Sequence, residues 1–249
     1  MLRFLNDVYS VFWVDLRNLR HHWRSTLATS LVQPILYLVA FGYGLGSGIS
    51  LEGVSYLAFV IPGIVALTAF STSFNGAASK LQVDRFFYKS FDELLMSPVS
   101  IYSIIIGKAL IGLLRGFISS SAILLVGVAL SPKLVISPWL VLVLLASCFV
   151  FALFGVLAAL VINSHQGMST FSNLVLLPMT FLSGTFFSLN QIPDVAKALL
   201  YALPLTHSSS TLRALALDGP FPWLSFFILI GFGAAFFAGC VLALKRASV

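Results

Sequence analysis

The side chains best placed to do chemistry in this sequence are two cations inside one long apolar stretch. Lys108 and Arg115 lie seven residues apart within residues 101–130. Seven residues are about two helical turns, so both side chains fall on one helix face, ~10 Å apart along the axis. Lys108 can extend its ammonium to a membrane surface, whereas the deeper Arg115 must face protein or water. Arg115 therefore has two open interpretations: contact with an anionic, lipid-like substrate, or hydrogen bonding to neighbouring backbone carbonyls.

Polar side chains in two other apolar stretches, Gln33 and Thr180, join Lys108 and Arg115 as candidate lining of a substrate pathway. Carboxylates are absent from the predicted span cores. Transport driven by an ion gradient usually needs an ionisable group near the middle of the membrane. The sequence therefore argues against ion coupling. All eight carboxylates lie elsewhere: Asp7, Asp15, Glu52, Asp84, Asp92, Glu93, Asp194 and Asp218.

Motifs for catalysis, nucleotide binding or metal binding are not found. No H-E-x-x-H occurs, and Gly107-Lys108 carries only the end of a phosphate-binding loop. Cys148 and Cys240 sit inside apolar runs and predict neither disulfides nor a metal site. We expect no catalytic residues, no metal and no cofactor in this chain. A membrane-embedded enzyme would need a polar cluster, for which the only candidates are Asn75, Asn163, His165 and Asn173.

Residues 84–96 form a second cluster of interest, because they combine charges with Phe86, Phe87, Phe91, Leu94 and Leu95. The segment is compatible with a helix that stops at Ser97-Pro98, since the residue before a proline disfavours helix. A purely solvated loop does not need so many apolar side chains. The segment either lies on the membrane or docks into a groove of a partner, and its sequence does not separate the two.

The elements that position these residues are membrane spans. Of the 249 residues, 59% are apolar and 9% are charged, against about 25% charged in a soluble domain. Windows without charge, each long enough for about 20 helical residues, predict an all-α integral membrane protein with one transmembrane domain over residues 1–249. The six predicted spans lie near residues 26–48, 56–77, 101–130, 139–162, 168–187 and 221–244.

Two further segments flank the spans. Residues 1–24 carry apolar side chains at helical spacing and predict an amphipathic interfacial helix, with a soluble helix on a partner as the alternative. Residues 192–217 contain two short apolar stretches split by Pro204, which predict a pair of re-entrant helices. Ten Lys and Arg residues fall on one side of this topology and three on the other. The positive-inside rule then places both termini in the cytoplasm, and the net charge of +6 reflects topology instead of nucleic-acid binding.

Three stretches resemble the type-2 permease subunits of ATP-binding-cassette (ABC) exporters, and most of all the nodulation-protein-J and daunorubicin-resistance branch. The first is QPILYL at 33–38 with GYGLG at 42–46. The second is DELLMSPVS at 92–100 with Gly107-Lys108. The third is FLSGTFF at 181–187, Ile192-Pro193, LPLTH at 203–207 and Arg213-Ala214. The resemblance runs nearly from end to end.

The resemblance implies a homodimer in the inner membrane with two copies of a separate ATPase subunit, which binds ATP and Mg. It implies an exporter that moves an amphiphile, such as a lipid, a lipid-linked saccharide or a hydrophobic drug, outward. The alternative is a non-transporting component of an assembly or insertion machine. The re-entrant pair would form an outer gate with Ile192, Pro204 and His207. Residues 84–96 would be the helix that couples to the ATPase, through Asp84, Arg85, Phe86, Phe87, Phe91, Glu93 and Leu94.

Overall fold

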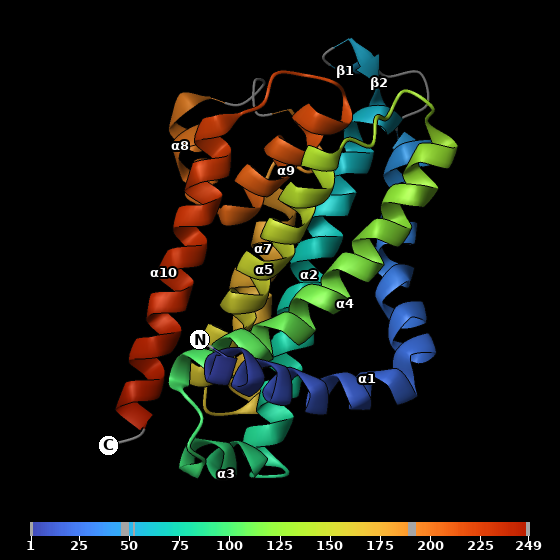
Figure 1. Cartoon of the computed structure of the whole chain (residues 1–249). Helices are drawn as coiled ribbons and strands as arrows, with labels where there is room; N and C mark the ends of the chain where they lie inside the picture. The colour runs from blue at the N-terminus through green and yellow to red at the C-terminus, as the bar shows by residue number, and fades with distance from the viewer. Residues whose placement is uncertain (1, 46–49, 52, 189–192, 248–249) are drawn as a thin grey trace.

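A computed structural model describes residues 2–45, 50–51, 53–188 and 193–247, and they form a helical bundle (Figure 1). Five of the described helices are long and apolar enough to cross a membrane. The chain is thus an all-α, multi-pass membrane protein, as predicted. The candidate spans are Trp23–Gly42, Tyr56–Phe86, Ile101–Leu130, Pro138–Val161 and Trp223–Arg246.

Helix α2 (Tyr56–Phe86) is the centre of the bundle, and it runs nine residues beyond the predicted span end at residue 77. It packs against α4 (Ile101–Leu130) and α5 (Pro138–Val161) over most of its length. Close approach needs small residues: a Cβ added at Gly112 of α4 would lie 2.6 Å from the Ser73 carbonyl oxygen of α2. Such contacts hold helices together in lipid, where apolar burial gives little driving force.

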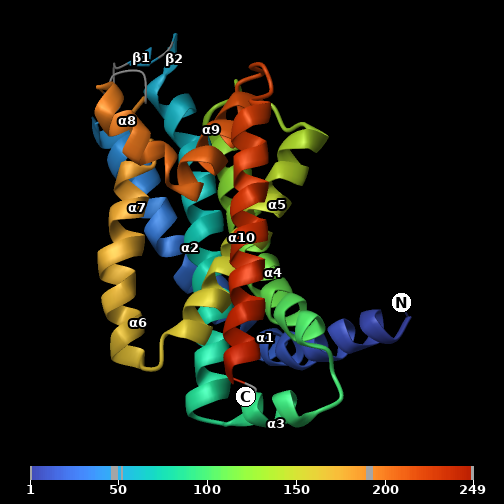
Figure 2. The same ribbon diagram turned by 90° about the vertical axis from the view of Figure 1, so that its left-hand side faces the viewer.

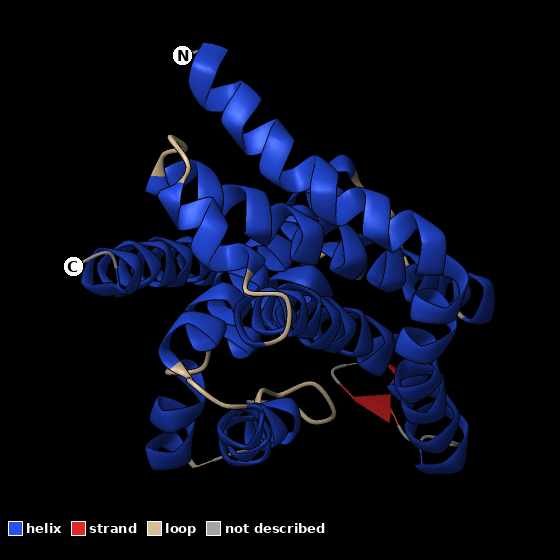
Figure 3. Ribbon diagram, turned by 90° about the horizontal axis from the view of Figure 1, so that it is seen from below, coloured by secondary structure: helices blue, strands red, loops and turns tan. Residues whose placement is uncertain are grey.

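The first helix differs from the expectation of an interfacial helix followed by a separate span. Helix α1 (Leu2–Tyr37) is one helix that crosses the lower end of the bundle and then turns upward (Figures 1 and 3). The π-helix η1 (Leu38–Leu45) continues it. Part of the predicted membrane-facing stripe packs on protein instead, because Val8 and Val11 are buried and Val11 contacts Gly107 of α4. Tyr9 and Trp13 stay exposed.

The predicted fifth span, near residues 168–187, is built from three consecutive pieces. Helix α6 (His165–Phe171), the π-helix η2 (Ser172–Leu176) and α7 (Leu177–Leu182) form one column along the bundle (Figure 2). None of the three is long enough to cross a bilayer by itself. A sixth span therefore stays a prediction. Helix α10 (Trp223–Ala247) closes the bundle.

The end of the bundle opposite α3 carries the short elements. Strands β1 (Ser50–Leu51) and β2 (Val54–Ser55) form a small antiparallel hairpin. Helices α8 (Asp194–Tyr201) and α9 (Pro204–Ala216) follow α7 and lie at the same end (Figures 1 and 2). They match the two predicted short stretches, and most of α9 is buried. Their re-entry into the membrane stays a prediction.

The coupling segment differs from the single helix predicted over residues 84–96. Asp84, Arg85 and Phe86 form the last turn of α2. The chain then breaks at Lys89, which has a φ of 52°, and α3 covers only Ser90–Met96. Left-handed backbone at a non-glycine residue is uncommon and here produces the sharp turn between the two helices. Helix α3 lies at the lower end of the bundle and connects α2 to α4 (Figure 1).

Candidate functional site

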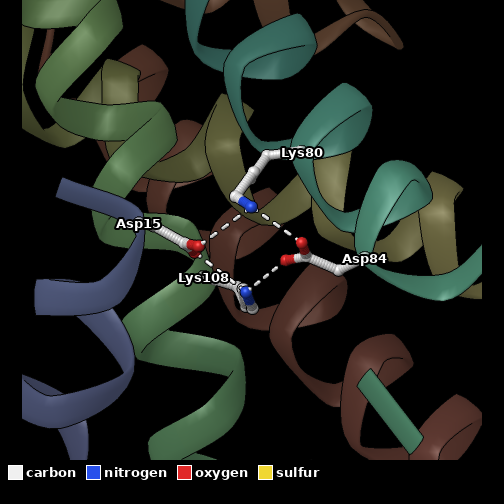
Figure 4. A network of polar contacts seen from close by, with 4 residues as sticks. All are labelled: Asp15, Lys80, Asp84 and Lys108. Carbon is white, nitrogen blue, oxygen red and sulfur yellow. Dashed lines mark hydrogen bonds and ion pairs between the residues drawn. The ribbon is translucent and has the colours of Figure 1, made fainter. Parts of the chain in front are cut away.

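Four charged side chains from three helices meet and form a closed ring of contacts, the charge quartet (Figure 4). Asp15 comes from α1, Lys80 and Asp84 from α2, and Lys108 from α4. Lys108 Nζ lies 2.9 Å from Asp15 Oδ2 and 2.6 Å from Asp84 Oδ2. Lys80 Nζ lies 2.7 Å from Asp84 Oδ1 and 3.6 Å from Asp15 Oδ1. The four formal charges sum to zero.

Burial makes the quartet a strong constraint on the three helices. Asp15, Asp84 and Lys108 are 2%, 4% and 6% exposed. A buried charge that loses its partner is strongly unfavourable. The helices can therefore separate here only at a high energetic cost, so α1 and the two helices that flank α3 are fastened together.

The quartet corrects two sequence expectations. Lys108 does not extend to the surface, and it does not line a pathway, because it lies inside this ring. Asp84 is likewise buried and does not offer a contact surface to an ATPase. Asp15 was missed. Its signal in the sequence is weak: it follows Val8 and Val11 at helical spacing, so it falls on the buried face of α1.

The last turn of α2 is tied to the end of α5 by Arg85. Its Nη1 donates to the carbonyl oxygens of Ala159 and, at 3.1 Å, Leu160, and its Nη2 lies 3.3 Å from Asn163 Oδ1. Carbonyls in the last turn of a helix lack internal partners, and a cation there is favourable. Arg85 was expected to be a surface group, but it is half-buried and structural.

The other predicted coupling residues divide by exposure. Phe87 is 71% exposed, and Glu93 is also exposed. Phe86 and Leu94 are half-buried, and the Phe86 ring packs near Arg85. Phe91 is 3% exposed and belongs to the apolar core, so it anchors α3 to the bundle instead of facing outward. The outward-facing apolar surface, which we call the α3 tip, comprises Phe87, Tyr88 and Met96, with exposed fractions of 71%, 70% and 87%.

A cavity of about 550 Å³ lies between the upright part of α1, α2 and α4. It brings together Gln33 and Arg115, two of the predicted pathway residues, and also Asn75. Thr180 is not part of it and donates to the Leu177 carbonyl within α7. Most of the polar lining consists of hydroxyl and amide side chains, including Thr26, Thr29, Ser30, Ser71, Thr72 and Ser119.

The opposite end of the bundle is fastened by Arg213 of α9, which sequence analysis placed in a motif without a role. Its Nε donates to the Phe59 carbonyl at 3.1 Å, and its Nη2 reaches the carbonyls of Gly184 and Thr185 at 2.9 and 3.2 Å. The guanidinium also stacks 3.9 Å from the Phe59 ring centroid. Arg213 thus joins α9 to α2 and to the turn after α7.

Two of the three predicted outer-gate residues, Pro204 and His207, lie in α9, as Arg213 does. Pro204 opens α9, and His207 is buried with its Nε2 2.8 Å from the Tyr201 carbonyl oxygen. Ile192 lies outside the described residues. Among the described residues, no three His, Cys, Asp or Glu side chains gather as a metal-ligand set.

The fold and site define a multi-pass membrane protein whose helices are fastened at both ends. Residues 6–217 match the family described as ABC-2 type transporter, and the chain belongs to that family. It is 26% identical to the inner membrane transport permease YadH of Escherichia coli strain K12 over 248 residues, which cover 95% of this chain and 96% of that protein. It is also similar to nodulation protein J. Identity is 26% over 205 residues with the protein of Sinorhizobium fredii and 27% over 202 residues with that of Rhizobium meliloti. Each match covers 79% of this chain and 76% of the relative. The chain is thus a transport permease of this family.

Proposed function

We propose that this chain is the membrane subunit of an ATP-driven exporter and that separate ATPase subunits bind at α3. The observation that carries the proposal is the α3 tip. Phe87 and Tyr88, in the turn between α2 and α3, and Met96, the last residue of α3, expose large side chains at the end of the bundle. Exposed apolar patches that no part of the chain covers are typical of interaction sites. Members of the family work with an ATPase partner.

The charge quartet gives the tip a way to act on the bundle. A push on α3 moves the last turn of α2 and the first turns of α4, and Asp15 ties both to α1. The upright part of α1 lines the cavity with α2 and α4. Movement of a docked ATPase would therefore change the shape of the cavity, which is the step that couples ATP to transport.

The working unit in this proposal is a homodimer in the inner membrane, with two ATPase subunits that supply ATP and Mg binding. Both termini lie toward the α3 end of the molecule (Figures 1 and 2), which supports their placement on the ATPase side. The sequence bias of ten cations against three supports a cytoplasmic position for that side.

The cargo in this proposal is an amphiphile, such as a lipid, a lipid-linked saccharide or a hydrophobic drug, moved outward from the cytoplasm or the inner leaflet. The cavity supports this class, because its hydroxyl and amide groups adjoin the apolar Trp23, Leu27 and Ile118. A site with a polar and an apolar part suits a ligand that has a polar head and an apolar tail.

The proposal is tested by co-expressing the chain with each ABC ATPase subunit of the same genome that lacks a membrane domain. We expect the chain to co-purify with one of them and to raise its ATP hydrolysis. Inside-out vesicles holding the pair should accumulate or flip an amphiphile only with ATP and Mg. Failure to co-purify with any of them, together with no ATP-dependent transport, would overturn the proposal. A stable complex that hydrolyses ATP but moves no amphiphile would favour the assembly or insertion role.

A further inference from the structure

The cavity between α1, α2 and α4 contains an arginine, Arg115, that forms no ion pair with any described residue. Arg115 lines it from α4, and none of the described residues that line it is an Asp or a Glu. Arg115 Nη2 lies 3.3 Å from Thr26 Oγ1, and its Nε is buried with no partner among the described residues. A guanidinium has five N–H donors, and the hydrogen bond to Thr26 engages one of them.

Other polar groups of the cavity are largely satisfied by their own surroundings. Thr29 Oγ1 donates to the Ser25 carbonyl at 2.9 Å, and Asn75 Nδ2 donates to the Ser71 carbonyl at 2.8 Å. Ser30 and Ser119 hydroxyls pair with each other at 3.0 Å. These bonds leave Arg115 as the strong donor with unused capacity, and they hold hydroxyl oxygens around it at fixed positions.

Lys108 and Arg115 differ in whether they have a carboxylate partner. Lys108 lies two helical turns from Arg115 on the same face of α4, about 10 Å away along the axis, and it is held by Asp15 and Asp84. The described part of the chain supplies two carboxylates for Lys108 and none for Arg115. Arg115 is half-buried, and a charge that is partly removed from water without a counter-charge is costly. Intramembrane cations are generally kept where a substrate or partner supplies the missing charge.

The packing of Arg115 also fixes where its guanidinium lies. Its stem crosses α2 at Gly76, where an added Cβ would lie 3.0 Å from Arg115 Cδ and 3.4 Å from Arg115 Cβ. The side chain therefore has little freedom to swing away. The cavity opens to the outside of the chain, because Trp23, Gln33 and Ser79 line it and are themselves exposed. Its volume of about 550 Å³ falls in the usual range for a small-molecule site, about 300–1,000 Å³.

We propose that this cavity binds the phosphate group of an amphiphile, with Arg115 as the counter-charge and the apolar part of the ligand along Trp23, Leu27 and Ile118. A guanidinium fork matches two phosphate oxygens and binds them in a bidentate manner. The ligand enters from the leaflet on the α3 side, because Trp23 is the first residue of the candidate span Trp23–Gly42, and the part of α1 before this span crosses the end of the bundle that carries α3 (Figure 1). Only the identification of this ligand as the cargo rests on the proposed exporter function.

Binding is tested on the purified full chain in detergent, without any ATPase. The probes are dioctanoyl phosphatidic acid, neutral dioctanoylglycerol and inorganic phosphate, each titrated against the thermal unfolding of the wild-type chain, Arg115→Gln and Arg20→Gln. Arg20 is an exposed cation on the part of α1 that crosses the lower end of the bundle, and it serves as the charge-matched control. We expect phosphatidic acid to bind the wild type and Arg20→Gln within twofold of each other, and Arg115→Gln at least tenfold more weakly.

The probes separate the sources of the phosphate. Tighter binding of phosphatidic acid than of inorganic phosphate supports a lipid, and Arg115-dependent binding of inorganic phosphate alone supports a soluble phosphate at the same site. Equal binding of phosphatidic acid and dioctanoylglycerol, or equal binding by the wild type and Arg115→Gln, overturns the proposal.

A second measurement avoids dependence on the folding of Arg115→Gln. Trp13, Trp139 and Trp223 are about half exposed, so their replacement by Phe leaves Trp23 as the sole reporter beside the cavity. Brominated phosphatidic acid should quench Trp23 fluorescence, and unbrominated phosphatidic acid should reverse it. Quenching that brominated diacylglycerol matches would refute the site. If phosphatidic acid binds at Arg115 but no ATP-dependent transport is found, the exporter function is wrong and the binding site stands.

Discussion

Lys108 Nζ of α4 and Asp84 Oδ2 of α2 lie 2.6 Å apart, so a buried ion pair closes the base of the loop that carries α3. Asp15 reaches the same ammonium from α1 at 2.9 Å. The helix expected to meet the ATPase is therefore held by buried charges at its base, in addition to the apolar anchor Phe91. The four charges of the quartet pair in one geometry, so removal of a single charge leaves a buried partner unpaired.

Replacing Lys108 by Met should destabilise the chain severely, by about 3–5 kcal/mol, because it leaves two buried carboxylates with one lysine. The double variant Lys108→Met/Asp15→Asn removes one charge of each sign and should recover part of the loss. The apparent unfolding temperature in detergent measures both. Lys133→Met, at an exposed lysine after α4, is the control and should change little. A double variant no more stable than Lys108→Met would contradict the idea that neutrality of the ring matters.

The α3 tip should be needed for ATPase coupling and not for folding. Phe87→Ala and Glu93→Lys alter exposed groups, so unfolding temperatures should stay near wild type while stimulated ATP hydrolysis falls severalfold. Leu224→Ala removes an equally exposed apolar side chain from α10 and should leave hydrolysis unchanged. If the tip variants hydrolyse ATP as the wild type does, the ATPase docks elsewhere.

Arg85→Glu should behave differently from Glu93→Lys, although both reverse a charge beside α3. The Arg85 guanidinium holds the last carbonyls of α5 at Ala159 and Leu160, and a carboxylate there would repel them. We expect a clear loss of thermal stability as well as of coupling. Arg85→Lys keeps the cation and should keep most of the stability. Wild-type stability of Arg85→Glu would show that the α5 contact is dispensable.

Loss of the Arg213 hydrogen bonds should increase local opening at the end of the bundle opposite α3. Arg213→Met removes the donors to the Phe59 and Gly184 carbonyls and leaves buried acceptors unsatisfied, at about 1–3 kcal/mol each. Hydrogen–deuterium exchange should rise in α9 and in the turn after α7, with less change at α3. Arg24→Met, at an exposed arginine of α1, should leave exchange in α9 unchanged. Exchange that rises equally throughout the bundle would indicate general unfolding instead.

His207 of α9 should make stability fall at mildly acidic pH. Burial lowers the pKa of His207, although its hydrogen bond with the Tyr201 carbonyl opposes the shift. Its Nδ1 is buried with no partner among the described residues, so protonation adds a donor without an acceptor. The unfolded chain takes up this proton near the ordinary pKa of about 6.5 while the folded chain resists it. Stability should therefore be retained above pH about 6.5 and lost as the pH falls below it.

His207→Gln keeps a donor for the Tyr201 carbonyl and does not titrate. Its unfolding temperature between pH 7.5 and 5.5 should fall less than that of the wild type. His21 is exposed on the part of α1 that crosses the lower end of the bundle, so His21→Gln should retain the full wild-type slope. An unchanged slope for His207→Gln would assign the acid sensitivity to other groups.

The sequence alone was sufficient to predict the positions of several spans and the family. The span at residues 101–130 coincides with α4, and those near 139–162 and 221–244 agree with α5 and α10 within a few residues. Apolar windows bounded by charges and prolines predict such spans, because lipid requires every backbone group to bond within its own helix. The family was also visible in local motifs, because a short run of residues can be compared without knowledge of the distant contacts that it makes.

The tertiary structure decided how the charges are shared between helices. Lys108 and Arg115 look alike in sequence, as two cations on one helix face, yet one is neutralised by Asp15 and Asp84 and the other faces a cavity without a carboxylate. Asp15 lies 93 residues from Lys108, and no local pattern predicts which helices will pack together. Periodicity specifies the face that a residue occupies, whereas its partner depends on the packing of whole helices.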